Sequence, residues 1–247
     1  MSADSPVTTT VIIPAFNYER YVEECIASCV GQEEPHGGYE IVLIDDGSTD
    51  GTAEIARRFE PRVHVIATEN GGIERAANLG LQKARGRFVL RVDADDRLRP
   101  EYLRSMVPAL ERRDVAFVYS EYETIDAQGR RTGTITLPDF DPQEISFRGD
   151  FLATGTLYRK SAVMQLGAYN ERVMNSGLEN FELILRMLAS GLEGYCVHTM
   201  LFGHRFHGAN LSTTRKQSII EYGRRLASEF GLPGYRTNEF HPSGLTL

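Results

Sequence analysis

The sequence has few cysteines, no long apolar run and no excess of basic residues. Its 247 residues contain only three cysteines, too few for a disulfide framework. Cys25 and Cys29 lie four residues apart on an expected helix face, and Cys196 falls in an expected strand. We therefore expect all three to pack in the core of a protein from a reducing compartment, and not to bind a metal.

The other deficits concern membranes and nucleic acids. No stretch approaches the roughly 20 apolar residues needed to span a bilayer. The N-terminal MSADSPVTTT lacks the basic and apolar regions of a signal peptide. We expect a cytoplasmic protein, which leaves open peripheral association with the inner face of the membrane. The net charge of −7 and the absence of a basic run argue against nucleic-acid binding.

What the chain does contain is an alternation of apolar strands and helices. β-Branched and apolar runs predict strands at 8–14, 39–44, 62–68, 87–92 and 116–119, with helical spacing between them. This order calls for a parallel sheet covered on both faces. We expect Asn17 to cap the first helix and Asp50 the second, at 51–59.

After residue 120 the pattern is less regular. We expect a hairpin turn at 126–129 and a loop at 139–142. We also expect strands at 154–158 and 195–202, helices at 160–166, 179–189 and 214–230, and a loop-like tail at 231–247.

The stretch 87–96, RFVLRVDADD, begins as a buried strand and ends in Asp93, Asp95 and Asp96. Aspartate is poor within a strand, so the acidic residues should mark its C-terminal edge. On an extended chain, carboxylates at i and i+2 point the same way, about 7 Å apart. That spacing suits two carboxylates that bind different parts of a cation-bearing ligand. The alternative is a solvated acidic turn.

Polar residues follow two other expected strands. Asp45 and Asp46 end the second strand, and Asn70-Gly71-Gly72 follows the third. Each cluster alone is ordinary turn composition. Because the carboxyl ends of parallel strands share one edge, where ligands bind in open α/β sheets, the three clusters together favour a site.

Two other protein classes place acidic residues at strand ends. A receiver domain has its acidic pair after the first strand and is about half this size. A dehalogenase-type phosphatase needs threonine or valine where Arg97 stands. The sequence therefore argues against both the receiver domain and the phosphatase.

Seven motifs occur in a fixed order. The first half contains VIIPAFN, IDDGSTDGT, NGGIERAANLG and VDADD, and the second TGTLYRKSAVMQLGAYNE, GLENFELILRM and HRFHGANLS. As an ordered set over residues 9–213, they resemble the family 2 glycosyltransferases with a GT-A fold. The resemblance implies an α/β fold with a Rossmann-like, mainly parallel sheet, and transfer of a sugar from a nucleotide-sugar to an acceptor hydroxyl with inversion.

The resemblance also implies an organisation and partners. We expect one domain over 1–247, with a nucleotide-sugar-binding half at 8–120, an acceptor-side half at 121–213, and a C-terminal helix and tail at 214–247. The donor is expected to be a UDP-sugar. The acceptor is expected to be a glycan or a lipid-linked molecule in surface polysaccharide synthesis.

Site residues are carried over from the matching motifs. Expected around the nucleotide-sugar are Pro14, Asn17, Asp45, Asp46, Asn70, Gly71, Arg75, Asp93 and Ala94. Asp95 matches a ligand of a divalent metal on the diphosphate, and His207 matches a histidine near that metal. Mn²⁺ or Mg²⁺ suits hard oxygen ligands and a diphosphate, and would stabilise the departing nucleoside diphosphate as a Lewis acid.

The sequence departs from the family where the general base is expected. Relatives usually carry Glu-Asp at a helix start, with the aspartate as base, but this chain has Glu179-Asn180. An amide cannot accept the proton. Either Glu179 is the base, or Asn180 only positions the acceptor while another group acts, or the protein binds nucleotide-sugars without transferring them. A nucleotidyltransferase would need a Gly-rich loop with a basic residue after the first strand, and PAFNYER lacks it.

Overall fold

The computed structural model describes residues 7–33, 37–148, 155–208, 210 and 214–232. The strands are β1 (Thr9–Ala15), β2 (Tyr39–Asp45), β3 (Val63–Ala67), β4 (Phe88–Arg91), β5 (Arg97–Leu98), β6 (Phe117–Ile125), β7 (Arg131–Ile135), β8 (Leu157–Arg159) and β9 (Gly194–Arg205). The helices are α1 (Val22–Val30), α2 (Thr52–Arg57), α3 (Ile73–Lys83), α4 (Tyr102–Glu111), α5 (Pro142–Arg148), α6 (Lys160–Gln165), α7 (Glu179–Ala189) and α9 (Lys216–Glu229).

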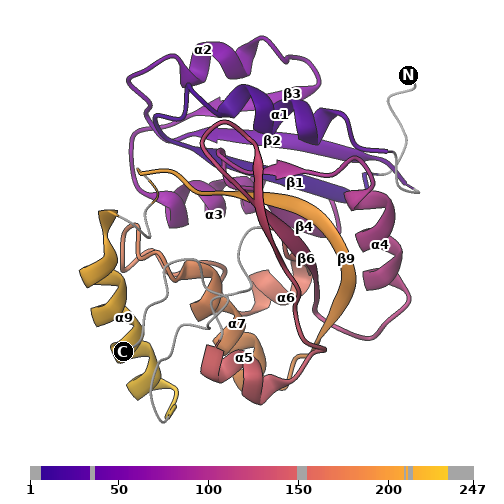
Figure 1. The fold of residues 1–247 in the computed structure, drawn as a ribbon, viewed down its shortest axis with the longest axis vertical. Helices are drawn as coiled ribbons and strands as arrows, with labels where there is room; N and C mark the ends of the chain where they lie inside the picture. The colour runs from indigo at the N-terminus through magenta and orange to yellow at the C-terminus, as the bar shows by residue number, and fades with distance from the viewer. Residues whose placement is uncertain (1–6, 34–36, 149–154, 209, 211–213, 233–247) are drawn as a thin grey trace.

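These strands form a nine-stranded sheet of order β3-β2-β1-β4-β8-β6-β9-β5 within the described residues, with β7 paired to β6. The first four strands of this order are parallel. Helices α1 and α2 lie on one side of them and α3 on the other (Figure 1). The expected α/β fold with helices on both faces is therefore confirmed.

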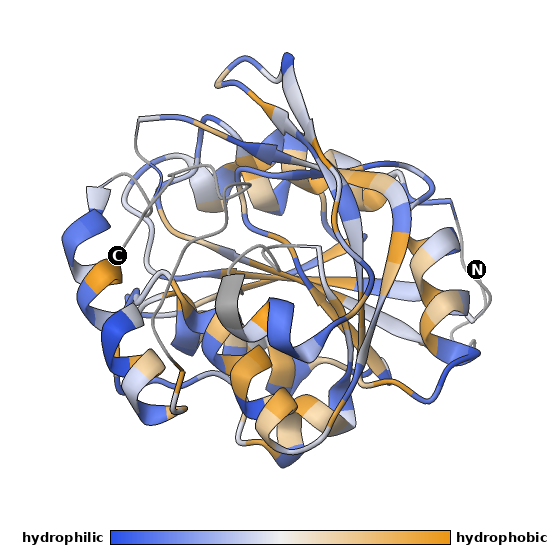
Figure 2. Ribbon diagram, turned by 60° about the horizontal axis from the view of Figure 1, so that its bottom comes forward, coloured by the Kyte–Doolittle hydropathy of each residue, from blue (hydrophilic) through white to orange (hydrophobic). Residues whose placement is uncertain are grey.

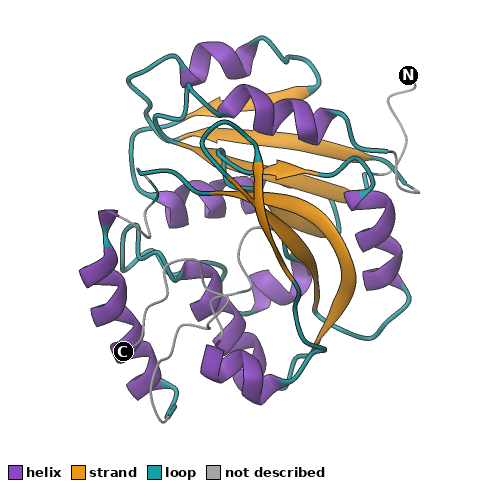
Figure 3. Cartoon of the chain, in the orientation of Figure 1, coloured by secondary structure: helices purple, strands orange, loops and turns teal. Residues whose placement is uncertain are grey.

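The second half of the sheet is mixed. β8 is antiparallel to both β4 and β6, whereas β6 is parallel to β9. β6 and β9 are long and strongly curved (Figure 3), and their register shifts near Glu121. The parallel order expected from the first half therefore holds for β1–β4, and β8 is inserted before the fifth expected strand.

Two strands extend beyond their expected ends because polar residues continue them. We expected strands to end at residues 119 and 202, but β6 continues to Ile125 and β9 to Arg205. Glu123 of β6 is buried and pairs with Arg97 at 3.2 Å and Arg99 at 2.9 Å. A charge neutralised in this way can occupy a buried strand position, which hydrophobic periodicity does not reveal.

The smaller elements agree in part with expectation. The turn at 126–129, the helix at 179–189 and the short helix after residue 160 are confirmed. α5 was not expected, and the strand expected from residue 154 is described only over Leu157–Arg159. Thr154, part of HRFHGANLS and the tail 233–247 lie outside the described residues.

The expected cap of the first helix is wrong, and Asp50 lies one residue before the N-cap position of α2, which Gly51 occupies. Asn17 has φ 59° and its Oδ1 accepts the N–H of Thr49 at 2.8 Å, while α1 begins only at Val22. Asp50 accepts the N–H of Thr52, the first residue of α2, at 2.9 Å. Both side chains join the end of β1 to the loop after β2.

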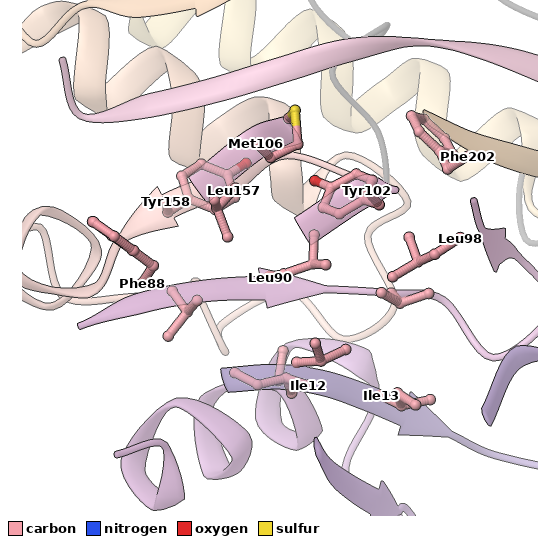
Figure 4. Packing of buried hydrophobic residues seen from close by; sticks show 14 of the residues in the cluster. Ile12, Ile13, Phe88, Leu90, Leu98, Tyr102, Met106, Leu157, Tyr158 and Phe202 are labelled. Carbon is pink, nitrogen blue, oxygen red and sulfur yellow. The ribbon is translucent and has the colours of Figure 1, made fainter. Parts of the chain in front are cut away.

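The core lies between the sheet and its helices. Leu90 of β4 pairs with Val11 of β1 on one side and with Leu157 of β8 on the other, and Figure 4 shows this part of the core. The central strands are largely apolar, whereas the helices carry both polar and apolar residues (Figure 2). The three cysteines are free and buried, as expected. Among the described helices, none is both long and apolar enough to span a bilayer.

Candidate active site

A cavity of about 640 Å³ lies beyond the carboxyl ends of β1 and β2; we call it the strand-end cavity. Five of the predicted site residues line it: Pro14, Asn17, Asp46, Asn70 and His207. Phe16 also lines it, with 42% of its surface exposed. The ends of β1, β2 and β3 thus meet at this cavity, whereas the aspartates that follow β4 do not line it.

Asp46 connects the end of β2 to the start of α3. Its carboxylate accepts the N–H groups of Gly71 and Gly72, each at 2.9 Å, and Asn70 donates to its backbone carbonyl at 3.0 Å. Burial raises the pKa of Asp46, and the two N–H groups oppose that rise. Asp46 therefore shapes the cavity wall as well as facing the cavity.

Two predicted residues lie next to Asp46 without lining the cavity. Asp45 is buried and accepts the N–H of Ser48 at 3.1 Å, so its carboxylate stabilises the turn after β2. Arg75 is exposed, and its side chain folds back over Gly71, where an added Cβ would lie 2.4 Å from Arg75 Cδ. Its positive charge also lowers the pKa of Asp46.

Residues 93–96, which we call the aspartate turn, are not extended. β4 ends at Arg91, and the N–H of Asp96 donates to the carbonyl of Asp93 at 2.9 Å. The expected extended spacing is therefore wrong. Asp93 pairs with Arg91 at 3.0 Å, and Asp95 lies 2.9 Å from His207, so the two carboxylates do have different partners. Ala94 is buried between them.

Asp95 and His207 are ligand-type side chains beside the cavity. His207 Nε2 lies 2.9 Å from Asp95 Oδ2, and Asn210 donates to the same oxygen at 3.2 Å. The His207 ring stacks on Tyr21 at 4.7 Å. Within the described ranges, no group of three or more His, Cys, Asp or Glu side chains could hold a metal. This pair still fits Mg²⁺ or Mn²⁺, since such ions often take one or two protein ligands plus phosphate oxygens.

Asp96, to which the sequence assigned no ligand role, holds the aspartate turn on β9. Its fully buried carboxylate accepts the N–H of Arg205 at 2.8 Å and lies 3.0 Å from His204 Nδ1. Burial raises the pKa of Asp96 to about 6, and although burial lowers the pKa of His204, the Asp96 charge raises it to about 9. The two groups therefore form a buried ion pair.

We expect Asp96→Asn to lower the free energy of unfolding by about 1–3 kcal/mol, because a neutral amide leaves the buried His204 imidazolium without its counter-charge. Urea denaturation measures this. Asp139→Asn is the matched control, since Asp139 lies 2.9 Å from His198 but 90% of its side chain is exposed. Its loss should be small. Equal losses in the two variants would contradict the role given to Asp96.

Glu179 and Asn180 begin α7 and lie outside the strand-end cavity. Glu179 is buried and accepts from Arg91 at 2.8 Å, so Arg91 bridges Glu179 and Asp93. Burial alone lowers the pKa of Arg91, but Asp93 and Glu179 raise it well above its usual value. Tyr169 donates to Asn180 Oδ1 at 3.2 Å. The positively charged Arg91 therefore lies between Glu179 and Asp93 of the aspartate turn.

Sequence reasoning did not identify Phe16, Arg91 or Asn175. Arg91 could have been found, because a charge within an apolar strand requires a buried partner. Phe16 lies inside a matched motif but was not singled out. Asn175, which lines the strand-end cavity, comes from a loop more than 100 residues after Asp46 and carried no pattern that could have identified it.

Comparisons with known proteins identify the family and the fold of this chain. The pattern of the family described as Glycosyl transferase family 2 matches residues 10–171. A Bacillus subtilis protein, provisionally named teichuronic acid biosynthesis glycosyltransferase TuaG, is 34% identical over 124 residues, covering 49% of this chain and 48% of that protein. Chondroitin synthase of Pasteurella multocida is 24% identical over 246 residues, covering 94% of this chain and 24% of that protein.

A solved structure shows the same fold. The crystal structure of S. aureus TarS 1-349 in complex with UDP-GlcNAc matches with a TM-score of 0.74 and 19% identity, covering 90% of this chain and 66% of that one. This likeness confirms the expected GT-A fold. The chain spans about half of the B. subtilis relative and about a quarter of the synthase. Because the family pattern matches more than half of its residues, the chain belongs to glycosyl transferase family 2.

Proposed function

We propose that the protein is a metal-dependent, inverting glycosyltransferase that uses a UDP-sugar. The observation that carries this proposal is the strand-end cavity, lined by Asp46 and Phe16 and bordered by the Asp95–His207 pair. The cavity thus offers a carboxylate, an aromatic face and the His207 imidazole, and Asp95 lies directly behind His207. These groups suit the base and the diphosphate of a nucleotide-sugar.

The base is proposed to bind near Phe16 and Asp46. An exposed aromatic ring offers a stacking surface, and a carboxylate accepts from the N–H of a base such as uracil. The structural relative was crystallised with UDP-GlcNAc, which supports a UDP-sugar as donor. Pro14, Asn17 and Asn70 complete this wall, and Asp93 is proposed to contact the ribose or sugar.

Asp95 and His207 are proposed to hold Mn²⁺ or Mg²⁺ together with diphosphate oxygens. A bound ion of this kind acts as a Lewis acid and offsets the charge of the departing nucleoside diphosphate. This chain's contribution is to orient the two ligands: Asn210 donates to Asp95, and Tyr21 stacks on His207.

The acceptor is proposed to bind at the start of α7. Asn180 is a hydrogen-bonding group for the acceptor and not a base. Glu179 is buried in an ion pair with Arg91 at 2.8 Å and lies outside the strand-end cavity, so we assign it a positioning role. A glycan or lipid-linked acceptor is supported by relatives named for teichuronic acid and chondroitin.

Calorimetric titration with UDP and UDP-sugars, with and without Mn²⁺, tests the donor site. We expect Phe16→Ala to weaken UDP binding about tenfold, because base–aromatic stacking contributes about 1–3 kcal/mol. Met164→Ala is the matched control, since Met164 is a comparably exposed apolar residue, at 43%, that does not line the cavity.

Each outcome of that titration has a distinct meaning. Failure of the unmodified protein to bind any UDP-sugar would overturn the donor assignment. Equal affinities for UDP in the two variants would overturn the role of Phe16. Binding without UDP release in the presence of acceptors would favour a nucleotide-sugar-binding protein over a transferase.

A further inference from the structure

Glu74 is a buried carboxylate that the proposed reaction does not use. It lies in the first turn of α3 with 1% of its surface exposed. Its two oxygens accept the backbone N–H groups of Asn175 and Ser176, each at 2.8 Å. A buried carboxylate needs such partners, and here they come from a segment about 100 residues further along the chain.

The contact is reciprocal. The Oδ1 of Asn175 accepts the N–H of Ile73 at 3.0 Å, so each side binds the backbone of the other. We call Glu74, Asn175 and the N–H groups that they bind the clasp. Asn175 has φ 51°, a conformation that asparagine adopts more readily than most residues. The segment also lies directly on Gly72, where an added Cβ would be 2.6 Å from Met174 Cγ.

On one side, the clasp adjoins the donor site. Ile73 and Asn175 line the strand-end cavity together with Asp46. Asp46 in turn binds the N–H of Gly72, the residue immediately before α3. The clasp therefore closes one wall of the cavity with a loop from the second half of the chain.

On the other side, the clasp leads into α7. Ser176, whose N–H binds Glu74, has its hydroxyl 3.4 Å from the Glu179 carboxylate. Burial raises the pKa of Glu74, and the charge of Glu179 is the next largest cause of that rise. Only two residues separate Ser176 from the first residue of α7.

We propose that the clasp is a positioning device that holds the start of α7, with Glu179 and Asn180, at a fixed place relative to the strand-end cavity. Glu74 is thus a positioning residue that does not contact the substrates. The proposal rests on the proposed function, since it assigns the donor to the cavity and the acceptor to α7.

Two single variants and their combination test the clasp, and a fourth variant serves as the matched control. Glu74→Ala removes both acceptors, and Asn175→Gly removes the bond to Ile73 while tolerating the positive φ. Glu40→Ala is the control, because Glu40 accepts from Thr10 and from the N–H of Arg85, just past the opposite end of α3. The third variant combines Glu74→Ala with Asn175→Gly.

We expect Glu74→Ala and Asn175→Gly to lower kcat for UDP release from UDP-GlcNAc at least tenfold. In Glu74→Ala, which changes no residue that lines the cavity, the Kd for UDP should change less than threefold. The double variant should lose little more than the worse single variant, because the two residues form one contact. Glu40→Ala should keep kcat, even if it lowers Tm. A purely structural role would lower Tm and leave kcat per folded molecule unchanged, which would overturn the proposal.

Hydrogen exchange of residues 174–180 supplies a measurement that needs no donor. We expect at least tenfold faster exchange in Glu74→Ala and no change in Glu40→Ala. Unchanged exchange would overturn the clasp itself. If the unmodified protein releases UDP from no UDP-sugar, the proposed function fails and the role of the clasp in transfer fails with it. If it does release UDP and kcat survives Glu74→Ala, only the clasp proposal fails.

Discussion

Asp95→Asn should lower the rate of sugar transfer on the order of 100- to 1,000-fold. Asparagine has nearly the same shape and can keep hydrogen bonds to His207 and Asn210, so the change removes mainly the negative charge. A hard cation bound by one carboxylate and one imidazole would lose its only charged protein ligand. The expected loss corresponds to several kcal/mol of transition-state stabilisation by the ion.

The readouts are kcat for UDP release and the effect of Mn²⁺ on UDP affinity. In the unmodified protein Mn²⁺ should tighten UDP binding, and in Asp95→Asn it should have little effect. Asp139→Asn is a suitable control, because Asp139 also lies near a histidine but far more exposed, and does not line the strand-end cavity. If Asp95→Asn retains both its rate and its response to Mn²⁺, then Asp95 does not bind the metal.

The first half of the fold could be predicted because each of its strands buries an apolar run. Ile12 of β1 and Leu90 of β4 belong to such runs, and their pattern alone indicates a strand. β6 and β9 could be predicted only in part, because Glu123 and Arg205 are buried charges whose partners lie elsewhere in the chain. Local periodicity contains no information about such partners.

In the candidate site, too, some residues could be predicted from local sequence pattern and others could not. Asp46 and Asp95 were found because they follow apolar strands, and strand ends converge in a parallel sheet. The hydrogen-bond partners of the acidic residues at the strand ends were not all found, because they depend on tertiary contacts. For example, Asp96 binds the backbone of Arg205, 109 residues later. The sequence offered a turn at residues 93–96 only as the alternative to an extended path, because the contacts that hold the turn, such as that of Asp96 with Arg205, come from distant residues.

Arg91→Met should destabilise the protein by about 3–5 kcal/mol, the usual result of removing one partner from a buried ion pair. Arg91 is 5% exposed and neutralises both Glu179 and Asp93. Methionine would leave two carboxylates facing each other, and the Glu179 side chain, 7% exposed, could not gain full hydration. Urea denaturation measures the loss, with Arg85→Met as control because Arg85 pairs with Glu40 at a largely exposed position.

A second variant separates stability from positioning. In Arg91→Met combined with Glu179→Leu, the Arg91–Glu179 pair becomes an apolar contact, and Asp93, whose side chain is 25% exposed, can turn toward water. Stability should then recover in part, since apolar replacement of a buried ion pair is often neutral or stabilising. The transfer rate should stay low, because the link from the aspartate turn to α7 is still missing. Recovery of both would show that the ion pair serves stability alone, and a loss in Arg91→Met no larger than in Arg85→Met would show that the pair is not buried in solution.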